Sequence, residues 1–182
     1  MHPLKAAIVA AALLGLTSCA GGGLYGHTVN YAPLGDESKA VSGAREYDPV
    51  MAQRQPEEWR KGSVTLFGVV TNRGGSGAAA RLALSVRRLE PRNLCDSAQD
   101  EDTCRVTVSD AEFGAVHALA TLKTDDDVGE HSINVGSLVR IVGTLEDDAD
   151  AADGAPVIKV TYLRHWPRYY FVTRAAAAQM RQ

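Results

Sequence analysis

The sequence has few of the residues from which most enzyme sites are built. It contains only three cysteines and five histidines in 182 residues. It has no Cys-x-x-Cys pair, no His-x-x-x-His pair and no Gly-Lys-Ser/Thr phosphate-binding loop. Residues 74–77, Gly-Gly-Ser-Gly, miss the Gly-x-Ser-x-Gly turn of serine hydrolases by one position. We therefore expect a non-catalytic protein without a cofactor or metal.

An enzyme remains the alternative, because a fold can join residues that are distant in the chain. A hydrolase or a metal-dependent enzyme would need such a convergence of titratable side chains. The histidines available for it are His27, His117, His131 and His165.

Long apolar runs are also scarce. The run from Ala6 to Leu14 follows Lys5 and is too short to cross ~30 Å of hydrocarbon. A positive start, a short apolar core and small residues before a cleavage point are the parts of a secretory signal peptide. Here the small residues end in a cysteine, at Leu-Thr-Ser-Cys in positions 16–19. That pattern resembles the lipobox of bacterial lipoproteins.

The resemblance implies that residues 1–18 are removed and that Cys19 becomes an N-terminus carrying acyl chains such as palmitate. Two or more acyl chains hold a protein stably on a membrane. In enterobacterial lipoproteins an aspartate after the cysteine favours the inner membrane, and Ala20 stands there in this chain. We therefore expect a lipoprotein anchored to the periplasmic face of the outer membrane.

Two cysteines remain once Cys19 is acylated. Cys95 and Cys104 lie in one polar segment, and an oxidising periplasm favours a disulfide between them. A zinc site is the alternative, but two cysteines without a nearby histidine cannot complete a tetrahedral shell.

The charge balance bears on the partners. The net charge of the whole chain is -3, and the signal segment contributes only Lys5 to it, so the mature chain is slightly more acidic. Such a chain has no general attraction for nucleic acid. An envelope protein or a glycan is the partner that we expect.

The pattern of apolar residues divides the mature chain into three parts. Residues 19–54 show no sustained period and read as the lipid anchor and a flexible tether. Residues 55–174 form the folded domain, and residues 175–182 form a short tail. Within the domain, residues 55–61 read as a short helix with Trp59 over the core. Strands are predicted at residues 63–71, 79–89, 105–109, 113–122, 137–145 and 156–164. The alanine-rich run 113–122 also suits a short helix, but Gly114 favours the strand.

Several short strands with little helix indicate an all-β protein, a small antiparallel OB-like barrel. OB-folds usually carry a helix between the third and fourth strands. The polar residues 123–136 occupy that place here and are a poor helix sequence.

The last two strands resemble those of the starvation-inducible outer-membrane lipoprotein (Slp) family. The resemblance rests on the lipobox and on four segments within the domain. It implies an outer-membrane lipoprotein without known catalytic residues. The segments are residues 67–70 (Phe-Gly-Val-Val), 135–145 (Val-Gly-Ser-Leu-Val-Arg-Ile-Val-Gly-Thr-Leu), 156–160 (Pro-Val-Ile-Lys-Val) and 165–167 (His-Trp-Pro).

Aromatic and cationic residues alternate after the last strand. Aromatic rings beside cations suit stacking on a sugar or an interface with a partner. The candidate binding patch consists of Arg164, Trp166, Arg168, Tyr169 and Tyr170. The alternative is a strand end that seals the barrel with its arginines pointing outward. We expect Tyr162 in the core and at least one of Trp166, Tyr169 and Tyr170 exposed.

Acidic residues gather in three loops, at residues 96–102, 125–130 and 147–153. The spacing does not match a calcium-binding EF-hand loop. We read these loops as solvated, and calcium binding is left open.

Overall fold

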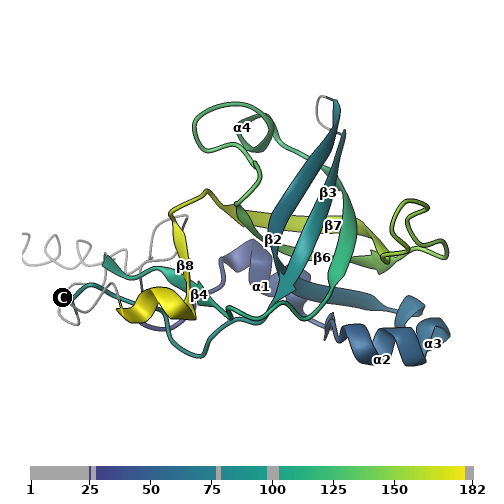
Figure 1. Ribbon diagram of the computed structural model, residues 1–182, viewed down its shortest axis with the longest axis horizontal. Coiled ribbons are helices and arrows are strands. Elements are labelled where there is room, and N and C mark those ends of the chain that lie inside the picture. The colour runs from purple at the N-terminus through teal and green to yellow at the C-terminus, as the bar shows by residue number, and fades with distance from the viewer. Residues whose placement is uncertain (1–24, 26–27, 77–78, 98–102, 179–182) are drawn as a thin grey trace, which may run out of the picture.

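The computed structural model describes residues 25, 28–76, 79–97 and 103–178 (Figure 1). Five strands form a closed barrel in the order β2-β3-β5-β7-β6, and β2 pairs with β6 to close it. All neighbours in the barrel are antiparallel except β5 and β7, which are parallel. This is the five-stranded OB-like topology, so the predicted fold class is confirmed. The strands are β2 (Ser63–Ser76), β3 (Ala79–Arg87), β5 (Ala115–Thr121), β6 (Leu138–Leu145) and β7 (Val157–Trp166).

The barrel interior follows the alternation that the sequence predicts. Along β3, Leu82, Leu84 and Val86 are buried, as expected for one face of a strand. The same core contains residues from every other barrel strand. They include Val64, Leu66 and Val70 of β2, Val116 and Ala118 of β5, Val139 and Ile141 of β6, and Ile158 of β7.

A β-bulge in β7 changes which side chains face this core. Val142 of β6 pairs with Tyr162, but the next residue, Gly143, pairs with Val160, so Thr161 is an extra residue in β7. A side chain on Gly143 would not fit, because its Cβ would lie 2.3 Å from the carbonyl oxygen of Lys159.

The extra residue reverses the alternation beyond it. Leu163 therefore packs on the core in line with Ile158 and Val160. Tyr162 is only half-buried and lies outside the core cluster, so the prediction that it is core is wrong.

A two-stranded parallel sheet lies beside the barrel. It pairs β4 (Val106–Val108) with β8 (Phe171–Thr173), which continues into a 3-10 helix at Arg174–Ala178. The strand predicted at residues 105–109 therefore exists, but it lies outside the barrel. The predicted disulfide between Cys95 and Cys104 is confirmed and ties the segment that leads into β4.

The segment predicted as a flexible tether folds against the barrel over its described part. It forms α1 (Gly35–Val41), β1 (Arg45–Glu46) and α2 (Pro49–Arg54). β1 adds to the edge of β2, and Asp48 caps α2 by accepting from the N–H groups of Val50 and Met51. The prediction of a flexible tether is therefore wrong for these residues. Their buried side chains contact residues from the far end of the chain, and such contacts leave no periodic pattern in the local sequence. Cys19 and residues 20–24 lie outside the described residues.

The predicted helix at residues 55–61 is α3 (Pro56–Arg60), and its Trp59 belongs to the barrel core. Between β5 and β6, where OB-folds carry a helix, the polar segment forms only the short α4 (Thr124–Asp127). Three aspartates lie in its first turn, where the helix dipole favours negative charge. Among the described residues, no helix has the length and apolar character needed to cross a membrane.

Candidate functional site

Two arginines stand side by side on the outer surface of the barrel. Phe67 of β2 pairs with Arg140 of β6, and Arg140 pairs in turn with Arg164 of β7. Like charges directly opposite each other on neighbouring strands destabilise a sheet. This row therefore needs a counter-charge. The adjoining row on the same surface consists of Val69, Leu138 and Trp166.

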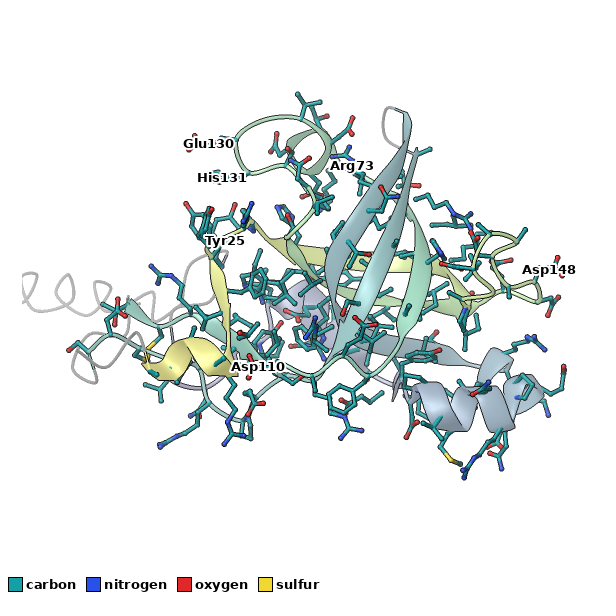
Figure 2. All side chains as sticks on the ribbon, in the orientation of Figure 1. Tyr25, Arg73, Asp110, Glu130, His131 and Asp148 are labelled. Carbon is teal, nitrogen blue, oxygen red and sulfur yellow. A yellow bond between two sulfur atoms is a disulfide. The ribbon has the colours of Figure 1, made fainter. Side chains whose placement is uncertain are left out.

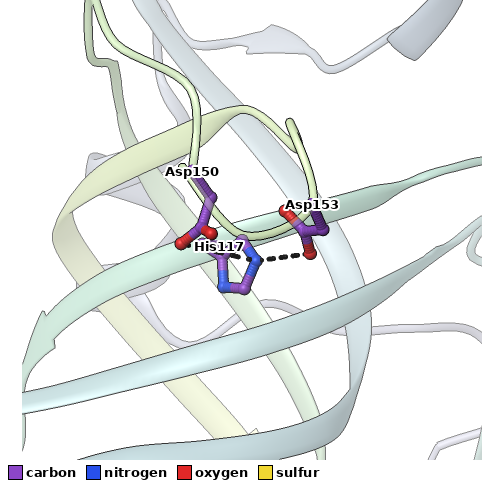
Figure 3. A group of neighbouring side chains, drawn as sticks. All are labelled: His117, Asp150 and Asp153. Carbon is purple, nitrogen blue, oxygen red and sulfur yellow. Dashed lines mark hydrogen bonds and ion pairs between the residues drawn. The ribbon is translucent and has the colours of Figure 1, made fainter.

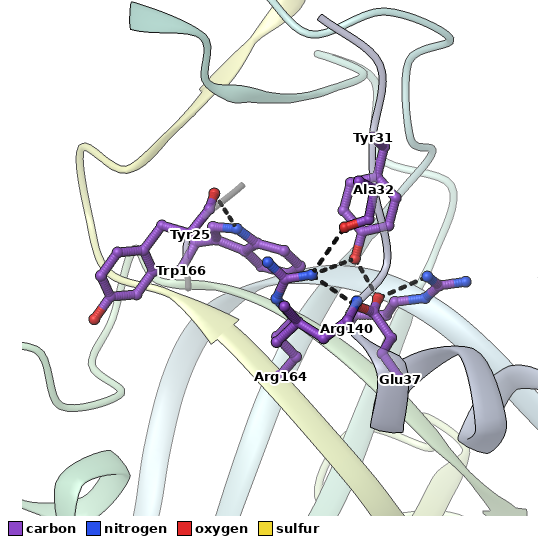
Figure 4. Close-up of polar contacts among 8 residues, drawn as sticks. Tyr25, Tyr31, Ala32, Glu37, Arg140, Arg164 and Trp166 are labelled. Atoms are coloured by element: carbon purple, nitrogen blue, oxygen red, sulfur yellow. Dashed lines mark hydrogen bonds and ion pairs between the residues drawn. The ribbon is translucent and has the colours of Figure 1, made fainter. Parts of the chain in front are cut away.

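Helix α1 supplies that counter-charge through Glu37, whose side chain is fully buried. One carboxylate oxygen lies 2.7 Å from Arg140 Nη1 and the other 2.6 Å from Arg164 Nη1 (Figure 4). The backbone N–H of Leu34 donates to Glu37 over 3.0 Å, and the hydroxyl of Tyr31 donates to it as well. We call residues 28–41, which cover this face of the barrel, the clasp.

The clasp holds Glu37 as a carboxylate. Burial, the largest single influence, would raise its pKa. Hydrogen bonds from one phenol, two guanidiniums and one backbone N–H outweigh burial, so the pKa lies below the ordinary value of about 4.5. Burial, followed by the hydrogen bond to Glu37, raises the pKa of Tyr31, which keeps its phenol neutral and a donor.

Trp166 is completely buried beneath the clasp. Its indole Nε1 donates to the carbonyl oxygen of Tyr25 over 2.7 Å. The ring packs near Tyr31 and Phe67, with centroids 5.9 and 6.0 Å away, and the Arg164 guanidinium lies 4.5 Å from its centroid. The clasp thus covers the apolar ring of Trp166, and the Tyr25 carbonyl accepts the hydrogen bond of its indole N–H.

The structure divides the predicted binding patch into two groups. Arg164 and Trp166 are buried by the chain's own N-terminal segment, so they are not available to a partner. Arg168 and Tyr169 are exposed, with Tyr169 78% exposed, and Tyr170 is half-buried. The expectation that at least one of the three rings is exposed is therefore confirmed, but a single patch of five residues does not exist.

The sequence-based reasoning missed Tyr31, Glu37 and Arg140. Glu37 is separated from its two arginines by 103 and 127 positions. The outward positions of Arg140 and Phe67 follow from strand alternation, but their burial depends on a segment with no periodic pattern. A charged residue on a polar stretch gives no sign that it will be buried.

His131 and His165, two of the candidate histidines, come together at one end of the barrel. His165 Nε2 donates to the carbonyl oxygen of His131 over 2.7 Å, and its Nδ1 lies 3.0 Å from Asp126 Oδ1. The ring of His131 lies beside those of Tyr25 and Tyr170. The contacts join the acidic loop at residues 125–130 to β7. His27 lies outside the described residues.

His117 of β5 meets the acidic loop between β6 and β7 (Figure 3). Its Nε2 lies 2.9 Å from Asp153 Oδ2 and 3.8 Å from Asp150 Oδ2. One imidazole and two carboxylates are ligands that suit zinc, and their ligand atoms lie within 4.8 Å of one another. However, Arg81 also pairs with Asp150 and would compete with a cation. The Arg81–Asp150 ion pair and the hydrogen bond between His117 and Asp153 account for the arrangement.

The two aspartates in this group are also held by the backbone. Hydrogen bonds from the N–H groups of Ala152 and Ala155 lower the pKa values of Asp150 and Asp153, respectively. The loop predicted to be merely solvated is thus pinned to the barrel wall.

A hollow of about 430 Å³ separates α2 and α3 from the same loop. Its floor is apolar, with Tyr47, Pro49 and Trp59 on one side and Leu145 and Pro156 on the other. Among the described residues that line it there is no serine, cysteine or histidine. Its rim carries Glu146, Asp147, Asp148 and Arg60.

Comparison with known proteins yields structural likeness only. No protein-family model and no curated protein matches the sequence. A putative aspartyl-tRNA synthetase from Leishmania major Friedlin matches with a TM-score of 0.39 and 18% identity, over 75% of this chain and 23% of that chain. A replication protein A heterotrimer bound to ssDNA matches with a TM-score of 0.28 and 15% identity, over 66% of this chain and 75% of that chain. At these scores neither match bears on ligand or activity.

The first prediction concerns the clasp. Glu37→Gln should lower the free energy of unfolding at pH 7 by about 3–5 kcal/mol, because it leaves two arginines without their buried counter-charge. Urea unfolding measures the change. Asp36→Asn is the matched control on the same helix, since the Asp36 side chain is 89% exposed, and it should change stability by less than about 0.5 kcal/mol.

The pH dependence of stability is a second test of the contribution of Glu37. Because the pKa of Glu37 is lower in the folded than in the unfolded protein, its stabilisation is complete above about pH 4.5. It is lost as the pH falls through the folded value, so the difference between Glu37→Gln and wild type should shrink in acid. Equal stability of the two proteins at pH 7 would show that this carboxylate does not hold the clasp.

The second prediction separates the buried and exposed parts of the aromatic segment. Trp166→Ala should lower the free energy of unfolding by about 3–5 kcal/mol, because it removes a fully buried ring. Tyr169→Ala should leave the unfolding midpoint nearly unchanged, because that ring faces solvent. A Trp166→Ala protein as stable as wild type would mean that this indole is not part of the core.

Proposed function

We propose that the protein is a lipid-anchored envelope protein with a non-catalytic structural or binding role. It is attached through Cys19 to the periplasmic face of the outer membrane. The lipobox supports this proposal, and so does the resemblance of residues 67–70, 135–145, 156–160 and 165–167 to the Slp family. The disulfide between Cys95 and Cys104 suits the oxidising compartment that a secreted lipoprotein enters.

The observation that carries the proposal is the clasp. Residues 28–41, which lie downstream of the lipobox cysteine in the sequence, fold onto the barrel. Glu37 and Trp166 are fully buried in that contact. A pull on the anchor is therefore transmitted to the barrel wall through ion pairs and a buried indole hydrogen bond.

The proposed partner is an envelope protein or a glycan rather than nucleic acid. The chain is net negative, and Arg140 and Arg164 on the outer barrel face are paired with Glu37 beneath the clasp. The described surface instead offers the exposed Arg168 and Tyr169 and the hollow with an acidic rim. An apolar floor with convergent polar groups is typical of a binding site.

The third prediction tests the anchor in cells. Cys19→Ser should abolish incorporation of labelled palmitate, leave the precursor uncleaved and remove the protein from the acylated outer-membrane fraction. The double variant Cys95→Ser, Cys104→Ser is the control, because it removes thiols without touching the lipobox, and it should still be labelled. A processed, labelled Cys19→Ser protein would overturn the proposal.

The alternative function, a periplasmic hydrolase or metal-dependent enzyme, has one observation in its favour, the His117, Asp150 and Asp153 group. The fourth prediction decides between them. Zinc titration of the mature protein followed by calorimetry should show no site that depends on His117. One equivalent of zinc that is lost in His117→Ala and kept in His131→Ala would favour the metal-dependent alternative instead.

A further inference from the structure

The site of chain attachment limits how far the barrel can stand from the membrane. Tyr25 is held by the Trp166 indole, and its ring centroid lies 4.6 Å from that of Tyr170 and 5.9 Å from that of His131. Tyr25 follows Cys19 by six residues. Even a fully extended chain of that length spans only about 20 Å. An acylated Cys19 therefore keeps the Tyr25 end of the barrel next to the lipid surface.

That end carries three of the large apolar side chains that the described residues expose. Val128 and Val135 come from the loop between β5 and β6 and are 70% and 57% exposed, and Tyr169 comes from the turn between β7 and β8. The loop and the turn are neighbours, since a Cβ on Gly136 would lie 3.4 Å from Arg168 Cδ. We call Tyr25, Val128, Val135, Arg168 and Tyr169 the anchor-end surface. Figure 2 shows Tyr25, Glu130 and His131 together at this end and Asp148 at the opposite end.

The backbone of the turn places Tyr169 outward in an unfavourable conformation. Among the described residues, Tyr169 is the only non-glycine with a positive φ, 78°. Such a conformation is unfavourable for a bulky side chain and points to a functional constraint. The Arg168 guanidinium lies 5.1 Å from the Tyr169 ring centroid, which places a cation beside an exposed phenol.

Tyrosine, short apolar side chains and arginine are suited to the boundary between headgroups and acyl chains, where one end of a side chain is apolar and the other wet. Among the acidic side chains nearby, Asp126 contacts His165 and Asp127 pairs with Arg73, whereas Asp125 and Glu130 are exposed. The exposed cations Lys123 and Arg168 offset these two carboxylates, so contact with lipid would depend on insertion more than on attraction to anionic headgroups.

We propose that the anchor-end surface rests on the same phospholipid leaflet that holds the acyl chains of Cys19. This inference rests on the proposed lipid anchor and adds an orientation to it. The β7–β8 turn and the β5–β6 loop dip into the headgroup region. The hollow beside α2 and α3 and the acidic loop at Asp148 then face away from the leaflet.

The test uses the full mature, acylated protein in phosphatidylcholine vesicles whose acyl chains carry bromine, which quenches tryptophan fluorescence on contact. Tyr169→Trp and Val135→Trp place probes on the anchor-end surface, and Val50→Trp, at a 55% exposed position on α2, is the matched control. Wild-type fluorescence from the buried Trp59 and Trp166 is subtracted. Mass spectrometry confirms the acylation of each sample.

We expect both anchor-end probes to be quenched at least about twofold more than Val50→Trp, since interfacial side chains reach about 5–10 Å into the headgroup and acyl boundary. Adding phosphatidylglycerol should change the quenching little. Equal quenching of all three probes in acylated protein would overturn the inference alone and leave the turn to a glycan or protein partner. A mature protein without acyl chains would overturn the proposed function and this orientation with it.

Discussion

A single buried carboxylate holds two distant parts of this chain together. Glu37 lies between Arg140 and Arg164, which neighbouring barrel strands place side by side. Without it, two like charges would face each other on the barrel wall, and the rings of Phe67 and Trp166 would lose their cover. With it, every hydrogen-bonding direction of the carboxylate is used, and a polar N-terminal segment becomes part of the folded domain.

The arrangement depends in turn on one extra residue in β7. Before the bulge at Thr161, Ile158 and Val160 face the barrel interior, and after it Leu163 does. Without the bulge, Arg164 and Trp166 would point into a core filled by aliphatic side chains, where an arginine would have no partner. The bulge therefore creates the outer row with which Glu37 pairs. The close approach of Gly143 to the Lys159 carbonyl is the steric condition for it.

The two ends of the barrel are chemically different, and the proposals assign them different surroundings. The Tyr25 end exposes valines and a tyrosine on two adjacent turns, within reach of the proposed acyl anchor. The opposite end carries the acidic loop, which Arg81 and His117 pin against the wall, and the hollow lined by Trp59 and Leu145. An envelope protein oriented in this way would present its hollow to the periplasm, where a protein or glycan partner could enter it.

Local pattern was enough to predict the five barrel strands, β4, the all-β class and the helix containing Trp59, because alternation is a property of neighbouring residues. The disulfide followed from the two remaining cysteines and the compartment that the lipobox implies. Strands β1 and β8 were not predicted. Local pattern also contains the lipobox, from which the acyl anchor at Cys19 is predicted. Local pattern could not show that Tyr162 leaves the core, since a bulge depends on the register of the partner strand.

Local pattern also could not show that the predicted tether folds, or that the clasp covers Arg164 and Trp166. Those outcomes rest on contacts between residues more than 100 positions apart, whose energies exist only once the barrel has closed. The sequence by itself determined which residues form the barrel strands and which cysteines pair. Only the tertiary structure decided which polar groups are buried, because a charge becomes a stable interior group only where distant partners compensate its desolvation.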